Sequence, residues 1–152
     1  MAALSFFERN FTMKTYISFA NSLTKLLGDD QTVKLTVDGY MPLCIERIGT
    51  SGEGHKLVAI AHTGIQNGDV MYDPEMVFRF IDWDGAQIAE PISFRNDYMG
   101  IRQEVYRYND EGKATHVNAR LRAELKSFSR TWFRNLKQQG FFSVQTIRQT
   151  FS

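Results

Sequence analysis

The spacing of the apolar residues changes twice along this chain, and that change restricts its fold more than any other feature. Residues 14–27 repeat apolar side chains every three or four positions, as an amphipathic helix does. From Val33 onward the period is two, typical of half-buried strands, and from about residue 117 to 139 the helical period returns. Because short turns join consecutive strands, the sequence predicts an α+β fold. We expect an antiparallel sheet of five to six strands flanked by an N-terminal and a long C-terminal helix.

Turn residues separate the predicted strands. An Asp-Gly pair at 84–85 lies between two apolar runs, which is a strong hairpin signal because both positions favour a positive φ. A polar, glycine-rich loop over residues 49–54 predicts a second hairpin. The predicted strands cover residues 33–37, 43–48, 56–62, 76–82, 86–92 and 101–108. The last predicted helix should bury one arc of side chains, made of Leu121, Leu125, Phe128, Trp132 and Leu136.

Length and composition indicate a single globular domain over residues 1–152, with residues 141–152 as a docked or flexible tail. With 43% hydrophobic and 23% charged residues, the chain is unlike disordered or coiled-coil proteins. The single cysteine, Cys44, excludes a disulfide framework and a cysteine-based zinc site. No apolar run approaches the roughly 20 residues that cross a bilayer, and residues 1–10 lack the pattern of a secretion leader. We therefore expect an intracellular protein without a membrane contact.

Basic residues gather on the last predicted helix, although the formal net charge of the whole chain is only +1. At 100° per residue, four of them form a stripe opposite the apolar arc: Lys126, Arg130, Arg134 and Lys137. Such a stripe can bind the phosphates of a nucleic acid or an acidic protein surface. It can also be the solvated outer face that most amphipathic helices have. All three interpretations stay open at this point.

A polar segment between two predicted strands carries the side chains that a divalent-metal phosphodiesterase would need. Carboxylates hold Mg²⁺ or Mn²⁺ and an imidazole can act as a base, which makes candidates of His62, Asp69, Asp73 and Glu75. Their spacing matches no metal motif, and every member also has a structural interpretation. Asn67-Gly68 supplies a turn, Asp73-Pro74 starts another, and Asp69 can bond neighbouring backbone amides. We favour the structural interpretation and predict no cofactor.

Three stretches of the chain resemble a family encoded on phages, plasmids and integrative elements of gut-type bacteria, to which no activity is assigned. They are His62–Phe80 (HTGIQNGDVMYDPEMVFRF), Phe94–Gly100 and Phe128–Gly140 (FSRTWFRNLKQQG). The resemblance covers roughly residues 43–141 and implies an accessory gene of a mobile element, acting in a bacterial cytoplasm. Small proteins of such elements often bind host machinery, including restriction and CRISPR nucleases.

The leading hypothesis is therefore a non-enzymatic accessory protein of a mobile element that binds a host protein or nucleoprotein, for instance as an anti-defence inhibitor. Separate acidic and basic segments and the lack of a recognisable nucleophile–base pair favour binding over catalysis. Two alternatives remain. One is a divalent-metal-dependent nuclease or phosphodiesterase at the polar segment, and the other is a direct DNA- or RNA-binding module that uses the basic stripe.

Overall fold

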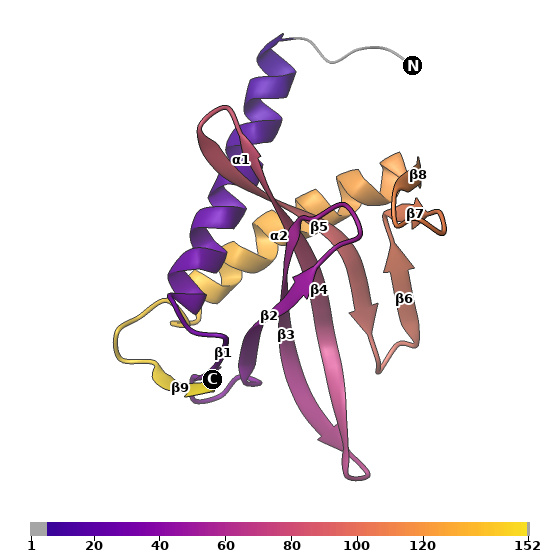
Figure 1. Cartoon of the computed structure of the whole chain (residues 1–152). Coiled ribbons are helices and arrows are strands. Elements are labelled where there is room, and N and C mark those ends of the chain that lie inside the picture. Colours follow the sequence, from indigo (N-terminus) through magenta and orange to yellow (C-terminus); the bar gives the residue numbers. More distant parts are fainter. Residues whose placement is uncertain (1–5, 152) are drawn as a thin grey trace.

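The structure, a computed structural model, describes the backbone of residues 6–151 and the side chains from Met13 to Phe151. Residues 1–5 and Ser152 lie outside the described part. The prediction that residues 1–10 are not a secretion leader therefore falls partly outside it. The elements follow the predicted order of helix, strands and helix (Figure 1). They are α1 (Phe6–Leu27), β1 (Thr32–Thr36), β2 (Leu43–Thr50), β3 (Lys56–Gln66), β4 (Asp69–Trp83), β5 (Ala86–Asn96), β6 (Ile101–Glu104), β7 (Tyr106–Tyr108), β8 (Ala114–Val117), α2 (Ala119–Gln138) and β9 (Ile147–Phe151). The α+β class is confirmed.

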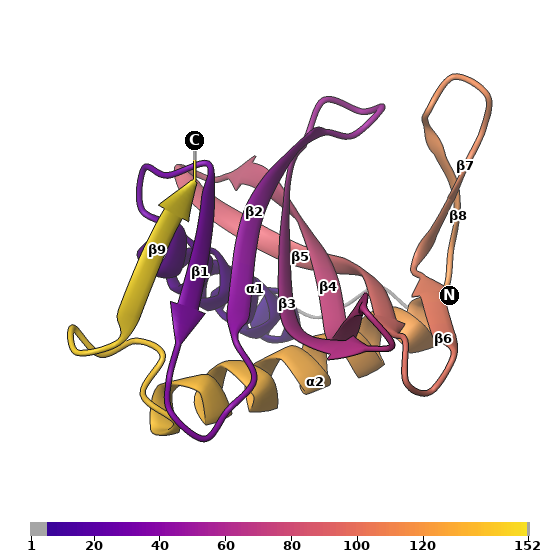
Figure 2. The ribbon, with the colours of Figure 1, turned by 90° about the horizontal axis from the view of Figure 1, so that it is seen from below.

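The main sheet has seven strands within the described residues, against five to six predicted. Their order is β6-β5-β4-β3-β2-β1-β9, and every neighbouring pair is antiparallel. The added strand is β9, the tail, which docks along β1 at one edge of the sheet (Figure 2). At the other edge, the single strand predicted over residues 101–108 is divided. Val105 is buried and its N–H bonds to the carbonyl of Ile92 (2.9 Å), after which β7 leaves the sheet to pair with β8.

Both helices cover one face of the sheet, where the main core lies (Figures 1 and 2). Three buried phenylalanine rings join the two helices to β4. The ring of Phe19 lies 5.9 Å from that of Phe78 and 5.5 Å from that of Phe133, which is 5.8 Å from Phe78. Burying large rings against each other supplies much of the hydrophobic stabilisation of such a layer. Neither helix, over residues 6–151, is both long and apolar enough to cross a membrane.

Helix α2 buries almost the arc that its sequence predicts. Its first turn is capped by Asn118, whose side chain accepts a hydrogen bond from the N–H of Leu121 (3.0 Å). Burial is confirmed for four of the five predicted residues: Leu121, Leu125, Trp132 and Leu136. It is wrong for Phe128, which is 39% exposed and lies at the margin of the sheet, edge-on to Phe94. Phe133 is buried in its place because the helix turns this side toward α1.

The polar segment 62–75 is not a loop but the turn half of a long hairpin. Strands β3 and β4 extend to Gln66 and from Asp69, and they project past the neighbouring strands (Figure 1). The turn between them is the Asn67-Gly68 pair, with φ angles of 53° and 83°. Beyond the helices this hairpin has no layer packed on it, so its strands carry polar and exposed residues. That composition led the sequence interpretation to a loop.

Candidate functional site

A groove runs between α1 and α2 on the outer side of the helical layer. Its main part has a volume of about 520 Å³ and is lined by Lys14, Thr15, Ser18, Phe19, Arg130, Phe133, Arg134, Lys137 and Gln138. A second hollow of about 300 Å³ shares Lys14, Ser18 and Lys137 with it and extends it toward Lys25 and Phe142. The two hollows adjoin at these three residues and are together called the basic groove below.

Five basic side chains line this groove, two from α1 and three from α2: Lys14, Lys25, Arg130, Arg134 and Lys137. Among the side chains that the structure describes, no aspartate or glutamate lines it. The ammonium groups of Lys25 and Lys137 lie over the same ring, that of Phe142, at 5.8 and 5.4 Å from its centroid. A concave surface with charges of one sign concentrates ions of the opposite sign. The charge of this lining therefore favours an anionic ligand over a cationic one.

The structure places three members of the predicted basic stripe in the groove, whereas Lys126 is not among the residues that line it. Lys126 is half-buried, with its ammonium 5.8 Å from the centre of the Tyr16 ring. Its pKa lies below the usual value, mainly because burial disfavours the charged form and also because Arg130 is near. The stripe is thus one wall of a two-sided site.

Sequence reasoning missed the second wall, which belongs to α1. Lys14 and Lys25 are eleven residues apart, close to three full helical turns, so both lie on the same side of α1. This spacing is visible in the sequence. Only the packing of α1 beside α2, through Phe19 and Phe133, shows that the two sets of bases face one depression.

Two buried phenylalanine rings lie below the main part of the groove. Phe19 and Phe133 line it, but they are only 2% and 4% exposed. A ligand would meet ammonium, guanidinium, hydroxyl and amide groups and the aliphatic stems that carry them. In the second hollow it would also meet the partly exposed Ile17 and Phe142. Interfaces with nucleic acids are polar and positively charged, whereas the centres of protein–protein interfaces are usually aromatic or aliphatic. The five basic groups are the feature of this lining that favours phosphates.

The four metal-site candidates are not brought together. Register pairs Ala61 with Glu75, which places Glu75 on the uncovered face of the sheet, while the neighbouring His62 points to the helical face. The ring of His62 lies between Trp132 and Phe141, at 5.7 and 5.6 Å. Burial lowers the pKa of His62, in agreement with a packed position under α2.

The remaining carboxylates of that set have local roles. Asp73 accepts a hydrogen bond from the side chain of Asn96 (2.7 Å), and Asp69 pairs with Gln66 beside the hairpin turn. Over the described residues, no group of three or more His, Cys, Asp and Glu side chains has an arrangement that could hold a metal ion. The segment thus supplies turns and strand pairing.

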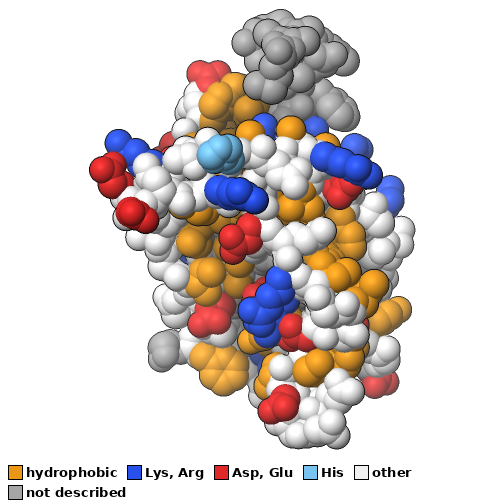
Figure 3. All heavy atoms as spheres, turned by 90° about the vertical axis from the view of Figure 1, so that its right-hand side faces the viewer, with side chains coloured by type: hydrophobic (Ala, Val, Ile, Leu, Met, Phe, Trp, Pro, Cys, Tyr) orange, Lys and Arg blue, Asp and Glu red, His pale blue; other side chains and the backbone are white. Residues whose placement is uncertain are grey.

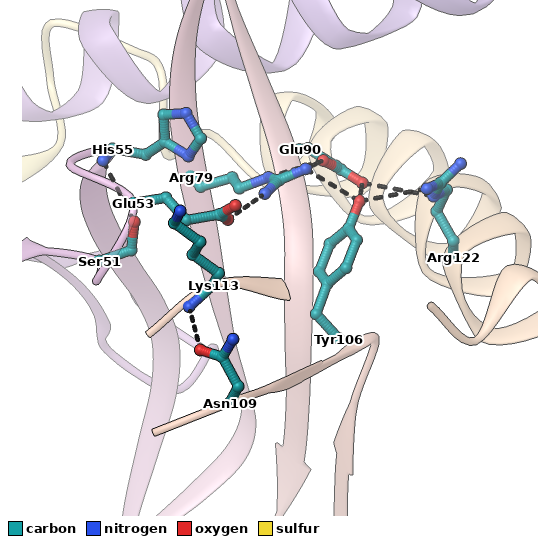
Figure 4. A network of polar contacts seen from close by, with 9 residues as sticks. All are labelled: Ser51, Glu53, His55, Arg79, Glu90, Tyr106, Asn109, Lys113 and Arg122. Atoms are coloured by element: carbon teal, nitrogen blue, oxygen red, sulfur yellow. Dashed lines mark hydrogen bonds and ion pairs between the residues drawn. The ribbon is translucent and has the colours of Figure 1, made fainter. Parts of the chain in front are cut away.

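A buried polar network, which the sequence did not reveal, lies at the other end of the molecule (Figure 4). The carboxylate of Glu90 on β5 is bound by Arg79 (2.8 Å) and accepts a hydrogen bond from the hydroxyl of Tyr106. The guanidinium of Arg79 also lies 4.3 Å from the centre of the Tyr106 ring, and Arg122 of α2 approaches Glu90 at 3.4 Å. These contacts fasten β7 and the start of α2 to the sheet.

The side of the molecule that bears β6, β7 and β8 differs from the groove. Acidic and basic side chains are interspersed there among hydrophobic and other polar ones (Figure 3). Arg79 reaches Glu53 at 3.4 Å, and Arg120 of α2 pairs with Glu124 at 3.1 Å. Mixed charges of this kind are typical of an ordinary solvated surface.

A sequence family described as a domain of unknown function, DUF6908, matches residues 14–142. The match begins at a lysine of the groove and ends at the phenylalanine ring that two groove lysines cover. It therefore includes residues 14–27 of α1, all of α2 and every strand except β9. No curated protein and no solved structure matches the chain.

Proposed function

We propose that this chain, which belongs to the DUF6908 family, is a non-enzymatic binding protein that holds the phosphate backbone of a nucleic acid in the basic groove. One observation carries the proposal. Five basic side chains from two helices line two adjoining hollows in which no described acidic side chain takes part. Neutralising several phosphates at once releases their counterions, which is the main source of sequence-independent affinity for nucleic acids.

The dimensions of the groove support this assignment. Eleven residues separate Lys14 from Lys25, which corresponds to about 16 Å along a helix. One strand of a duplex carries a phosphate for every rise of about 3.4 Å, so a groove of this length can follow several phosphates. Contacts to phosphates position a nucleic acid without reading its bases. We expect binding that depends little on sequence.

A second surface favours a protein contact in addition. Exposed apolar side chains gather on the turns at one end of the sheet: Met41, Ile65, Val70, Tyr98 and Met99. Tyr98 and Met41 meet over Gly64, where a Cβ atom would lie 2.5 Å from the Tyr98 hydroxyl and 3.8 Å from the Met41 Cε. Exposed Met and Tyr side chains are frequent in protein interfaces.

The target that fits both surfaces is a nucleoprotein, with its nucleic acid in the groove and its protein against the apolar turns. We place this role in the bacterial cytoplasm, in an accessory protein of a mobile element. The basis is the resemblance of His62–Phe80 to proteins of such elements. Inhibition of a host defence complex is one such role, since many of these complexes contain nucleic acid.

Charge reversal in the groove tests the proposal. In the double variant Arg130→Glu/Arg134→Glu, we expect weaker binding to unrelated single strands and duplexes alike, measured by fluorescence anisotropy between about 50 and 200 mM salt. The slope of log affinity against log salt should become shallower by about two, one for each lost phosphate contact. Arg102→Glu/Arg107→Glu is the matched control, because it makes the same charge change at exposed positions of β6 and β7.

Equal loss of affinity in the groove and control variants would show that only net charge matters, which contradicts a defined site. Weak nucleic-acid binding by the wild type would also overturn the proposal. If the same groove reversals then slow association with an acidic protein, the groove is a site for such a protein instead.

A further inference from the structure

Strand β9 forms an open edge of the main sheet (Figure 2). It pairs with β1 from Ile147 opposite Thr36 to Phe151 opposite Thr32, and all five of its residues are exposed. The exposed fractions of Ile147 and Phe151 are 64% and 53%. Alternation places these two apolar side chains on the face of the sheet that the helices leave uncovered.

Edge strands usually carry a feature that prevents pairing with another chain, such as an outward charge, a proline, a bulge or a very short length. The opposite edge, β6, has only four residues, and both Arg102 and Glu104 are exposed on it. The one charged residue of β9, Arg148, is engaged with the end of α1. It donates hydrogen bonds to the carbonyls of Leu26 (2.6 Å) and Leu27 (3.0 Å) and pairs with Asp30. The only charged side chain of β9 is thus bound to the end of α1, and no proline interrupts the strand.

The residue pattern of β9 is complementary to itself. In an antiparallel pair of two β9 strands centred on Gln149, Ile147 lies opposite the partner's Phe151, and Arg148 lies opposite the partner's Thr150. Two apolar cross-strand pairs thus form on one face, with no like charges opposed. We propose that β9 pairs with β9 of a second copy of this chain, which makes a symmetric dimer with one continuous sheet.

The proposed dimer does not depend on the proposed function, but it has a consequence for binding. Both basic grooves lie on the helical face, and a continuous sheet places them in one assembly. Two linked sites on one nucleic acid raise the overall affinity through effective concentration, without new contacts. The dimer itself needs no ligand, so its test uses the protein alone.

Sedimentation velocity over a concentration series up to about 200 µM tests the dimer, since a short strand interface is expected to be weak. We expect the wild type to associate reversibly to a dimer and Ile147→Lys/Phe151→Lys to remain monomeric, because lysines would oppose each other across the pair. Ile65→Lys/Val70→Lys is the matched control. These residues are also an exposed apolar cross-strand pair, but they lie at the β3–β4 turn. This variant should still dimerise.

A cysteine at the symmetry axis gives a second readout that does not depend on dimer stability. Two Gln149 residues lie directly opposite each other, with Cβ atoms about 5 Å apart, so Gln149→Cys should form a disulfide-linked dimer under mild oxidation. Gln103→Cys, exposed on β6, is the control, and the wild type accounts for Cys44, whose pKa is raised by burial. Persistent monomer with no more cross-linking than the control would overturn the proposal, as would a dimer that survives Ile147→Lys/Phe151→Lys.

Discussion

Truncation of Trp132 to alanine is expected to lower the free energy of unfolding by about 3–5 kcal/mol. Trp132 is 6% exposed, and its ring lies 5.7 Å from that of His62 and 5.9 Å from that of Phe128. Its removal leaves a cavity between α2 and the sheet that neighbouring rings can fill only in part. Urea denaturation followed by far-UV circular dichroism measures the change.

Phe128→Ala serves as the comparison, because Phe128 is 39% exposed although it also lies on α2. Its loss of stability should be clearly smaller, since much of the ring already contacts water. An unchanged unfolding curve for Trp132→Ala would show that α2 does not pack in this orientation. Similar losses in the two variants would contradict the burial difference between them.

The second large effect is a loss of stability at alkaline pH. Burial, followed by the Glu90 carboxylate, raises the pKa of both Tyr16 and Tyr106 from 10 to about 12. Between pH 10 and 12 the unfolded chain releases these protons while the native protein keeps them. The free energy of unfolding therefore falls as pH rises, by up to about 1.4 kcal/mol per pH unit for each tyrosine.

Tyr106→Phe separates the two tyrosines. In this variant the free energy of unfolding should fall less steeply with pH, because only Tyr16 still contributes. At neutral pH, the variant should be less stable than the wild type by about 1–3 kcal/mol. Glu90 then loses a buried hydrogen bond, and Arg79 loses its bond to the hydroxyl (2.9 Å). Tyr40→Phe, which removes a hydroxyl from an exposed ring, is the control. A decline as steep in Tyr106→Phe as in the wild type would contradict the role of the network.

Periodicity predicted the fold well wherever one face of an element is buried. The strand at Val33 and the helix that buries Leu125 and Leu136 are examples, because burial selects apolar residues at regular intervals. It failed at the turn half of the β3–β4 hairpin, where fewer residues are buried, and at β9, which is short and exposed along its whole length. Phe128 shows that an apolar arc predicts the buried side of a helix only approximately. A residue at the margin of the arc can be exposed.

Only the α2 side of the candidate site could be predicted from the sequence. The basic stripe on α2 follows from spacing alone, but its meeting with Lys14 and Lys25 depends on contacts between helices about a hundred residues apart. The same holds for Glu90, whose partners come from β4, β7 and α2. Long-range contacts of this kind leave no local signal in one sequence. Conversely, the carboxylates near Asp73 suggested a metal site because they are close in sequence. In the structure they lie at different positions along strand β4 and do not converge.

The location of nucleic-acid contacts tests the central claim most directly. Amide ¹H–¹⁵N spectra recorded while a short duplex of arbitrary sequence is added should show shifts concentrated in residues 14–25 of α1 and 126–138 of α2. The uncovered face of the sheet and the β7–β8 hairpin should remain unchanged. Shifts centred on that face or on the hairpin, or no shifts at low salt, would contradict a phosphate site between α1 and α2.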